Sequence, residues 1–349
     1  MSCASNSKAL CVLLGFQQEI REFIGNAEQC NLSSASRWLY WSTQNIKHKV
    51  LWPKNEEFDN LSKRLYSRLR GTNGDDRIYR KRTRTKLSLA HVRSLLLDVL
   101  CVISGLRPSC LVDCCTLTKE LVKLLLDFFA DEDDKRFFYG EVGHIRAVML
   151  DGNVFFVNVG AFVREQMVSG LHIDIIDVSP NLTRPRRLSQ TSRTDTLRLK
   201  AFADGTLSFC KQLLSSTSQV LEWTRPLHFN PTALAGLLLC YPCVYDMSGS
   251  SNETFEGWHK QDNCLAMCPL YMLQMVVLLS EQEHKEIVLY KFSVPQHLIN
   301  DRYDGKQEQN PHFSSLNLLR ARCLIQLQRS IDQSCLAPTL QAHVRVDTL

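Results

Sequence analysis

Three aspartates and two adjacent cysteines stand out because each lies in an apolar run that reads as a buried strand. Asp113, Cys114 and Cys115 close one such run, and Asp174 and Asp177 lie in a second. The end of a buried strand is a common position for functional groups in α/β proteins. A carboxylate there can act as a general acid or base, and a cysteine just before a helix can form a nucleophilic thiolate. These five residues are therefore the candidate lining of a catalytic pocket.

Each of these residues also has an ordinary explanation. A strand-end aspartate can accept backbone hydrogen bonds or face water, and paired cysteines can be buried as small apolar residues. A phosphatase loop needs an arginine six positions after its cysteine, but Glu120 and Leu121 occupy those positions. His144 and His172 are candidate bases, although nothing in the sequence pairs either with a thiol. We favour the ordinary explanation, and the catalytic one stays open.

Four cysteines in the C-terminal half have the short spacings of a zinc site. Cys240-x-x-Cys243 and Cys264-x-x-x-Cys268 can each supply one edge of a tetrahedral thiolate set. Their neighbours argue against a metal, because zinc knuckles lie in polar, glycine-rich turns whereas leucine and methionine flank these cysteines. Four buried thiols are the favoured interpretation, so we expect neither a metal nor a cofactor, and a zinc site is the alternative.

A strongly basic segment spans residues 64–86. It holds nine arginines and lysines and two aspartates, so it carries +7 in a chain whose net charge is +5. Any attraction to a polyanion should therefore arise in this segment. Arg80-Lys81-Arg82-x-Arg84-x-Lys86 resembles a nuclear-import signal. No zinc finger, recognition helix or aromatic ribonucleoprotein strand accompanies it, so nucleic acid is disfavoured as a partner.

A second basic motif, Arg186-Arg187-Leu188-Ser189, has the spacing that basic-directed protein kinases prefer. A phosphate on Ser189 could be held by the neighbouring arginines. The motif is short, so an unmodified surface loop is the alternative.

Several common catalytic and cofactor motifs are absent from the sequence. It has no phosphate loop, no Gly-x-Gly-x-x-Gly, no His-Glu-x-x-His and no Gly-x-Ser-x-Gly. Their absence disfavours the common nucleotide-binding, metalloprotease and serine-hydrolase classes. Whether the chain is an enzyme is left undecided by its motifs.

The composition is that of a globular intracellular protein. Of 349 residues, 44% are hydrophobic and 22% charged, which is enough apolar material for one or two domains. The longest apolar stretches contain Asp98, Pro242 or Pro269, so we expect a soluble protein without a membrane span. No secretory signal is evident, so the 14 cysteines should stay reduced in the cytoplasm, with the nucleus as the alternative.

Hydrophobic periodicity predicts a mixed α/β fold, in which helices pack on a mixed sheet that contains one β-hairpin and follows an N-terminal helical region. Asp151-Gly152 is the expected hairpin turn, because both residues tolerate positive φ angles. The helices are expected at residues 9–24, 56–69, 88–103, 118–130, 206–223, 230–240 and 314–334. The strands are expected at residues 110–115, 145–150, 154–159, 171–178 and 287–294.

Four segments describe the expected domain organisation. Residues 1–70 form N-terminal helices that pack on the main domain, and residues 71–86 form the exposed basic loop. Residues 87–335 form the mixed α/β domain. Residues 336–349 form a flexible tail.

Several short segments resemble uncharacterised protein family 0739, a family with no assigned activity. The resemblance implies one intracellular globular protein and supplies no catalytic or binding residue. The segments that carry it are Leu111-Val112-Asp113, Asp177-Val178-Ser179, Gly236-Leu237-Leu238-Leu239, Tyr241-Pro242, Asn263-Cys264-Leu265, Pro269-Leu270 and Phe292-Ser293-x-Pro295.

Two functional hypotheses follow from the sequence. The first is a non-catalytic interaction protein with a protein partner, in keeping with a complete core and a charged loop. The second is an enzyme of unrecognised class whose pocket holds Asp113, Cys114, Cys115, Asp174 or Asp177. Convergence of these side chains in one concave pocket would favour the enzyme, and dispersal would favour the interaction protein.

Overall fold

The computed structural model describes residues 52–71, 87–130, 145–169, 173–224, 230–247, 263–266, 268–279, 285–300, 316–334 and 340–348. In these segments the strands form three sheets, with the orders β1-β3-β2-β6, β5-β4-β7 and β10-β8-β9. Parallel and antiparallel pairs both occur, and helices pack on the sheets. The expected mixed α/β class is therefore confirmed. The helix expected at residues 9–24 and nearly all of the basic loop lie outside the described residues.

The four-stranded sheet is built around the expected hairpin. Its turn is Asp151-Gly152, with φ angles of 48° and 78°, as a tight turn between twisted strands requires. Alternate residues of the hairpin pack on opposite faces of the sheet, Ala147 and Phe156 on one and Val148 and Phe155 on the other. The strands of this sheet are β1 (Ser109–Leu111), β2 (Ile145–Leu150), β3 (Asn153–Asn158) and β6 (Val220–Glu222).

Helices cover both faces of this sheet. One face packs against α4 (Leu89–Ile103) and α5 (Lys119–Ala130), on which α3 (Asn55–Gly71) packs in turn. The other face packs against α7 (Val159–Ser169), α8 (Arg193–Ser215) and α9 (Pro231–Leu238). Side chains cap the first turns of α4 and α9. Ser88 accepts a hydrogen bond from the His91 backbone N–H at 3.1 Å, and Asn230 accepts one from the Thr232 backbone N–H at 2.8 Å. Each such cap contributes about 1 kcal/mol.

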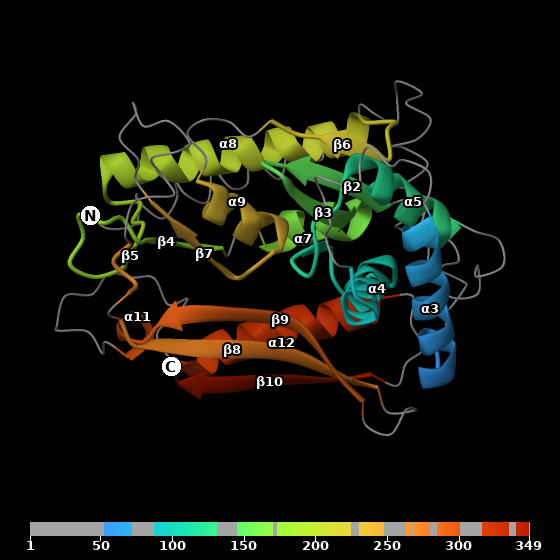
Figure 1. The fold of residues 1–349 in the computed structure, drawn as a ribbon. Coiled ribbons are helices and arrows are strands. Elements are labelled where there is room, and N and C mark those ends of the chain that lie inside the picture. The colour runs from blue at the N-terminus through green and yellow to red at the C-terminus, as the bar shows by residue number, and fades with distance from the viewer. Residues whose placement is uncertain are drawn as a thin grey trace.

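The two three-stranded sheets share a third hydrophobic core, separate from the cores on the two faces of the four-stranded sheet. β4 (Asp174–Asp177) lies between β5 (Arg186–Arg187) and β7 (Cys243–Asp246), antiparallel to the first and parallel to the second. β8 (Leu270–Leu279) lies between β9 (Lys285–Pro295) and β10 (Leu340–Thr348). α12 (Leu316–Gln333) packs along β10 and β8, and α11 (His297–Asn300) follows β9. Figure 1 shows β8, β9 and β10 with α12 in the lower half, and α8 along the opposite side of the molecule.

The structure corrects three sequence expectations. Residues 336–349 are not all a flexible tail, because residues 340–348 form β10 and pair with β8 along their whole length. The alternation of Leu340, Ala342, Val344 and Val346 with polar residues is the pattern of a half-buried strand. The helix expected at residues 206–223 is α8, which begins earlier, at Arg193, and ends at Ser215. Residues 220–222 of the expected range form the strand β6 instead. The strand expected at residues 110–115 ends at Leu111, so Asp113 lies in an exposed loop.

Candidate functional site

Among the described residues, a cluster of five charged side chains lies where two parallel strands end. Ile175, Ile176 and Val244 are buried apolar residues, as expected for strands covered on both faces. β4 and β7 pair in register, with Asp174 opposite Cys243 and Asp177 opposite Asp246. Because parallel strands end at the same edge of a sheet, Asp177 and Asp246 lie side by side there.

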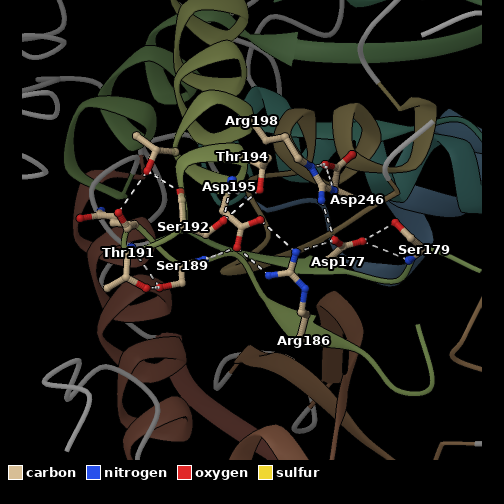
Figure 2. Close-up of polar contacts among 12 residues, drawn as sticks. Asp177, Ser179, Arg186, Ser189, Thr191, Ser192, Thr194, Asp195, Arg198 and Asp246 are labelled. Atoms are coloured by element: carbon tan, nitrogen blue, oxygen red, sulfur yellow. Dashed lines mark hydrogen bonds and ion pairs between the residues drawn. The ribbon is translucent and has the colours of Figure 1, made fainter. Parts of the chain in front are cut away.

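Arg198 of α8 joins the two strand-end carboxylates. Its Nη1 lies 2.5 Å from Asp177 Oδ2, and its Nη2 lies 2.6 Å from Asp246 Oδ2. Figure 2 shows the guanidinium between the two aspartates. The Asp177 side chain is 3% exposed, that of Asp246 16% and that of Arg198 22%, so these charges interact with little screening by water.

Arg186 of β5 extends the cluster to the first turn of α8. Its Nη1 and Nη2 donate to the two carboxylate oxygens of Asp195 at 2.6 and 2.9 Å, and Nη2 also lies 3.2 Å from Asp177 Oδ2. The two-pronged contact with Asp195 is the geometry in which arginine and carboxylate bind most strongly. Ser192 caps α8 by accepting a hydrogen bond from the Asp195 backbone N–H at 3.4 Å. Asp195 also accepts one from the Ser189 N–H at 3.0 Å.

The ion pairs set the protonation of the three carboxylates. Burial alone would raise the pKa of Asp177, but hydrogen bonds from Arg198 and Ser179 outweigh it and hold that pKa below its ordinary value. Hydrogen bonds from Arg186 lower the pKa of Asp195. Burial raises the pKa of Asp246, and Arg198 offsets only part of that rise. Asp177 and Asp195 are thus stable anions that are poorly suited to accept a proton.

The arrangement is a clamp more than a reaction centre. Three carboxylates and two guanidinium groups form ion pairs across β4, β5, β7 and α8, so the cluster keeps one negative charge in excess. In the part of the chain that the structure describes, no group of three or more His, Cys, Asp or Glu side chains is placed to hold a metal ion. Surface hollows of about 370 and 360 Å³ lie on α3 with α5 and on α8, and none of the clustered side chains lines either one.

The five candidate residues of the enzyme hypothesis do not come together. Asp177 belongs to the cluster, whereas Asp174 points to the opposite face of β4 and lies 3.2 Å from Arg322 of α12. Asp113, Cys114 and Cys115 follow β1 in the other sheet, and Asp113 is exposed. None of the five lines either hollow.

The pKa values of the adjacent cysteines Cys114 and Cys115 are shifted in opposite directions. The two sulfurs lie 3.8 Å apart, and both side chains are half-buried. The hydrogen bond between the two thiols lowers the pKa of Cys114 and raises that of Cys115. Cys114 is therefore the more reactive thiol of the two. The candidate bases, His144 and His172, lie outside the described residues.

The four cysteines proposed for zinc occupy different environments. Cys240 accepts a hydrogen bond from Gln166 at 3.4 Å in the core beside α9, whereas the Cys243 thiol faces the Ser293 carbonyl oxygen at 3.7 Å. Cys268 donates to the Cys264 carbonyl oxygen at 3.2 Å. Burial raises the pKa of Cys240, of Cys243 and of Cys264, which disfavours the thiolates that zinc requires.

Four members of the cluster were not among the candidate catalytic residues that the sequence predicts. Arg198 and Asp195 lie on the early part of α8, ahead of the helix expected at residues 206–223. Ser192-x-x-Asp195 is a capping pattern that could have placed the start of this helix. Asp246 ends the short apolar strand β7, as Asp177 ends β4. Arg186 was noted only for the kinase motif that ends at Ser189.

Comparison with known proteins places the chain in a family. A family model described as Domain of unknown function (DUF4504) matches residues 77–320, so the chain belongs to this family. This agrees with the expectation of an uncharacterised family, while identity with family 0739 stays a prediction. No curated protein and no solved structure matches the chain. Among the described helices, none is long and apolar enough to cross a membrane.

Proposed function

We propose that this protein is a non-catalytic interaction protein, and that it binds an extended segment of a partner protein along β10. The observation that carries the proposal is the open edge of the sheet β10-β8-β9. β10 is the end strand of this sheet, and Figure 1 shows it along the lower margin of the molecule. In the described segments no further strand pairs with its outer side.

A long edge strand is a ready template for another strand. β10 pairs with β8 over nine residues, so on its other side it presents a row of backbone N–H and C=O groups over the same length. Extended peptides bind such edges through main-chain hydrogen bonds, and alternate side chains supply specificity. Nine residues exceed the length of many edge strands in globular proteins.

The two faces of β10 define the chemistry of the partner segment. Val344 is buried beneath the sheet, with Ala342 and Val346 half-buried beside it. His343 and Arg345 are exposed on the opposite face. An added strand would place its own alternate residues beside these two rows. We therefore expect a partner segment that alternates apolar residues with polar ones.

The dispersal of the candidate catalytic residues also supports this function. Asp174 and Asp177 are held in ion pairs, and the cysteine pair follows β1, a strand of a different sheet. The cytoplasm or the nucleus is the compartment that we propose. The ten described cysteines are free thiols, which fits a reducing compartment.

Two proline variants test the docking edge. Successive N–H groups of a strand point alternately to its two sides. Of the two variants Ala342→Pro and His343→Pro, one therefore loses a backbone hydrogen bond to β8, and the other loses an N–H group that faces the outer edge. Thermal unfolding identifies the variant that keeps its fold. Each tagged full-length chain is then used for affinity purification from cells with nuclease present, followed by quantitative mass spectrometry.

The proposal expects a stoichiometric protein that binds the wild-type chain and is lost from the folded, edge-blocked variant. Lys291→Ala is the matched control, because Lys291 is an exposed residue on β9, at the other edge of the same sheet. The partner should be retained by this control. A partner retained by the edge-blocked variant would overturn the docking edge, and a chain without any partner, or with only a second copy of itself, would overturn the proposed function.

A further inference from the structure

We propose that Ser189 is a phosphorylation site for a basic-directed protein kinase, and that phosphate at this position competes with Asp177 and Asp195 for Arg186. This inference is independent of the docking edge, because it rests on the segment between β5 and α8. It joins the sequence motif that ends at Ser189 to the ion-pair cluster of Figure 2.

The segment has the extended form that kinase substrates adopt. Arg186 and Arg187 form β5, which is an edge strand of its sheet, and Leu188 continues it with a backbone hydrogen bond to Ile175 at 2.9 Å. Ser189 follows at once. Its hydroxyl lies 2.7 Å from Thr191 Oγ1 and accepts a bond from the Thr191 N–H at 3.2 Å. Both contacts are with an exposed neighbour, so the hydroxyl can be freed without opening the core.

Phosphate on this hydroxyl would change the balance of the cluster. The transfer forms a bond between Ser189 Oγ and the γ-phosphorus of ATP, ADP leaves with the electrons of the broken bridging bond, and the hydroxyl proton passes to the base of the kinase. The product adds nearly two negative charges. The Ser189 N–H already donates to Asp195, so those charges arise beside a carboxylate that is 1% exposed.

Arg186 is the group that can respond. Its side chain is 44% exposed although it contacts two buried carboxylates, so it can turn toward a phosphate at the surface. Asp177 would keep Arg198 and Ser179. Asp195 would lose its two-pronged partner, and a buried carboxylate without a counter-charge is strongly disfavoured. The first turn of α8 should therefore loosen.

The loosened segment also touches the third core. His297 of α11 lies 2.8 Å from the Pro185 carbonyl oxygen, and Arg187 donates to the Leu298 carbonyl oxygen at 3.2 Å. Residues just before Ser189 thus hold α11 against β5. Phosphorylation would weaken the attachment of this corner of the sheet β10-β8-β9 as well as the start of α8.

The test uses the full-length chain, the catalytic subunit of cyclic AMP-dependent protein kinase and MgATP. Intact-mass and peptide mass spectrometry locate the phosphate, and hydrogen exchange compares the two forms over residues 185–200. One phosphate on Ser189 and at least threefold faster exchange at the start of α8 are expected. Ser189→Ala should accept no phosphate there while exchanging like the unmodified wild type.

A second variant separates competition for Arg186 from simple crowding. Asp195→Asn removes the carboxylate that the phosphate opposes, so phosphorylation of this variant should change exchange much less than in the wild type. Failure of the folded chain to accept phosphate at Ser189 would overturn the site. Phosphate on Ser189 with unchanged exchange, or with the same change in Asp195→Asn, would overturn the competition.

Discussion

Replacing Arg198 with methionine removes the side chain that joins the ends of β4 and β7. Arg198 contacts Asp177 at 2.5 Å and Asp246 at 2.6 Å, and both carboxylates are mostly buried. Methionine keeps the apolar stem of the side chain and loses the charge and its hydrogen bonds. Asp177 retains Arg186 and Ser179 as partners, so the unfavourable charge is left chiefly on Asp246.

The expected loss follows from the burial of these groups. Breaking one side of a buried ion pair costs about 3–5 kcal/mol because the remaining charge is uncompensated. Partial exposure of Arg198, at 22%, favours the lower end, about 3 kcal/mol. For a chain of 349 residues, unfolding entropy of about 2.1 cal/mol/K per residue makes this a fall of about 4 °C in the melting temperature.

A double variant tells the ion pair apart from lost packing. In Arg198→Met/Asp246→Asn the carboxylate without a partner is neutral, so about 1–2 kcal/mol of the loss should return. Unfolding in urea, followed by circular dichroism and by tryptophan fluorescence, measures each free energy. Arg193→Met is the control, because Arg193 is exposed on the same helix, and its cost should stay within about 0.5 kcal/mol. An equally small cost for Arg198→Met, or no recovery in the double variant, would refute the clamp.

Three further predictions concern the acidic side chain of Asp195, the cysteine pair and β10. Arg186 lowers the pKa of Asp195, so Asp195 stabilises the fold above its unfolded pKa and this stability is lost as the pH falls through the folded pKa. Asp195→Asn should therefore flatten the decline in unfolding free energy below about pH 5, measured in urea at each pH. Cys114 should react with iodoacetamide at neutral pH faster than Cys264, because burial raises the pKa of Cys264 whereas the pKa of Cys114 is lowered. Peptide mass spectrometry measures the labelling rate of each cysteine, and equal rates would contradict this prediction. Val344→Asp should cost at least about 2 kcal/mol by burying a carboxylate in β10, whereas His343→Asp on the exposed face should cost within about 0.5 kcal/mol. Equal unfolding free energies for these two variants would argue against β10 as a packed strand.

Local sequence signals predicted much of the fold. The helices expected from residues 88 and 230 start there, because Ser88 and Asn230 each accept a capping hydrogen bond. Asp151-Gly152 was expected to turn a hairpin, and it does so with two positive φ angles. These features depend on a few neighbouring residues, so they can be predicted from short stretches of sequence. β10 has a local signal in its alternating apolar residues, but its pairing with β8 depends on a strand far away in the chain, which no short stretch of sequence indicates.

The candidate site was predictable only in part. Asp177 was found because it ends an apolar run, which is a local signal. Its contacts with Arg198 and Asp246 depend on the pairing of β4 with β7 and on the docking of α8. Nothing local to either residue indicates that proximity. Asp174 was grouped with Asp177 by the sequence, although an odd spacing of three on a strand places the two side chains on opposite faces.

Hydrogen exchange on β10 tests the proposed interaction most directly. The full-length chain is labelled alone and with the partner that it recovers, and exchange is read at each amide of residues 340–348. The proposed function predicts slower exchange at every second amide, because only those N–H groups face the open edge of β10. Unchanged exchange along β10 with the partner bound, or slower exchange confined to another surface, would contradict it.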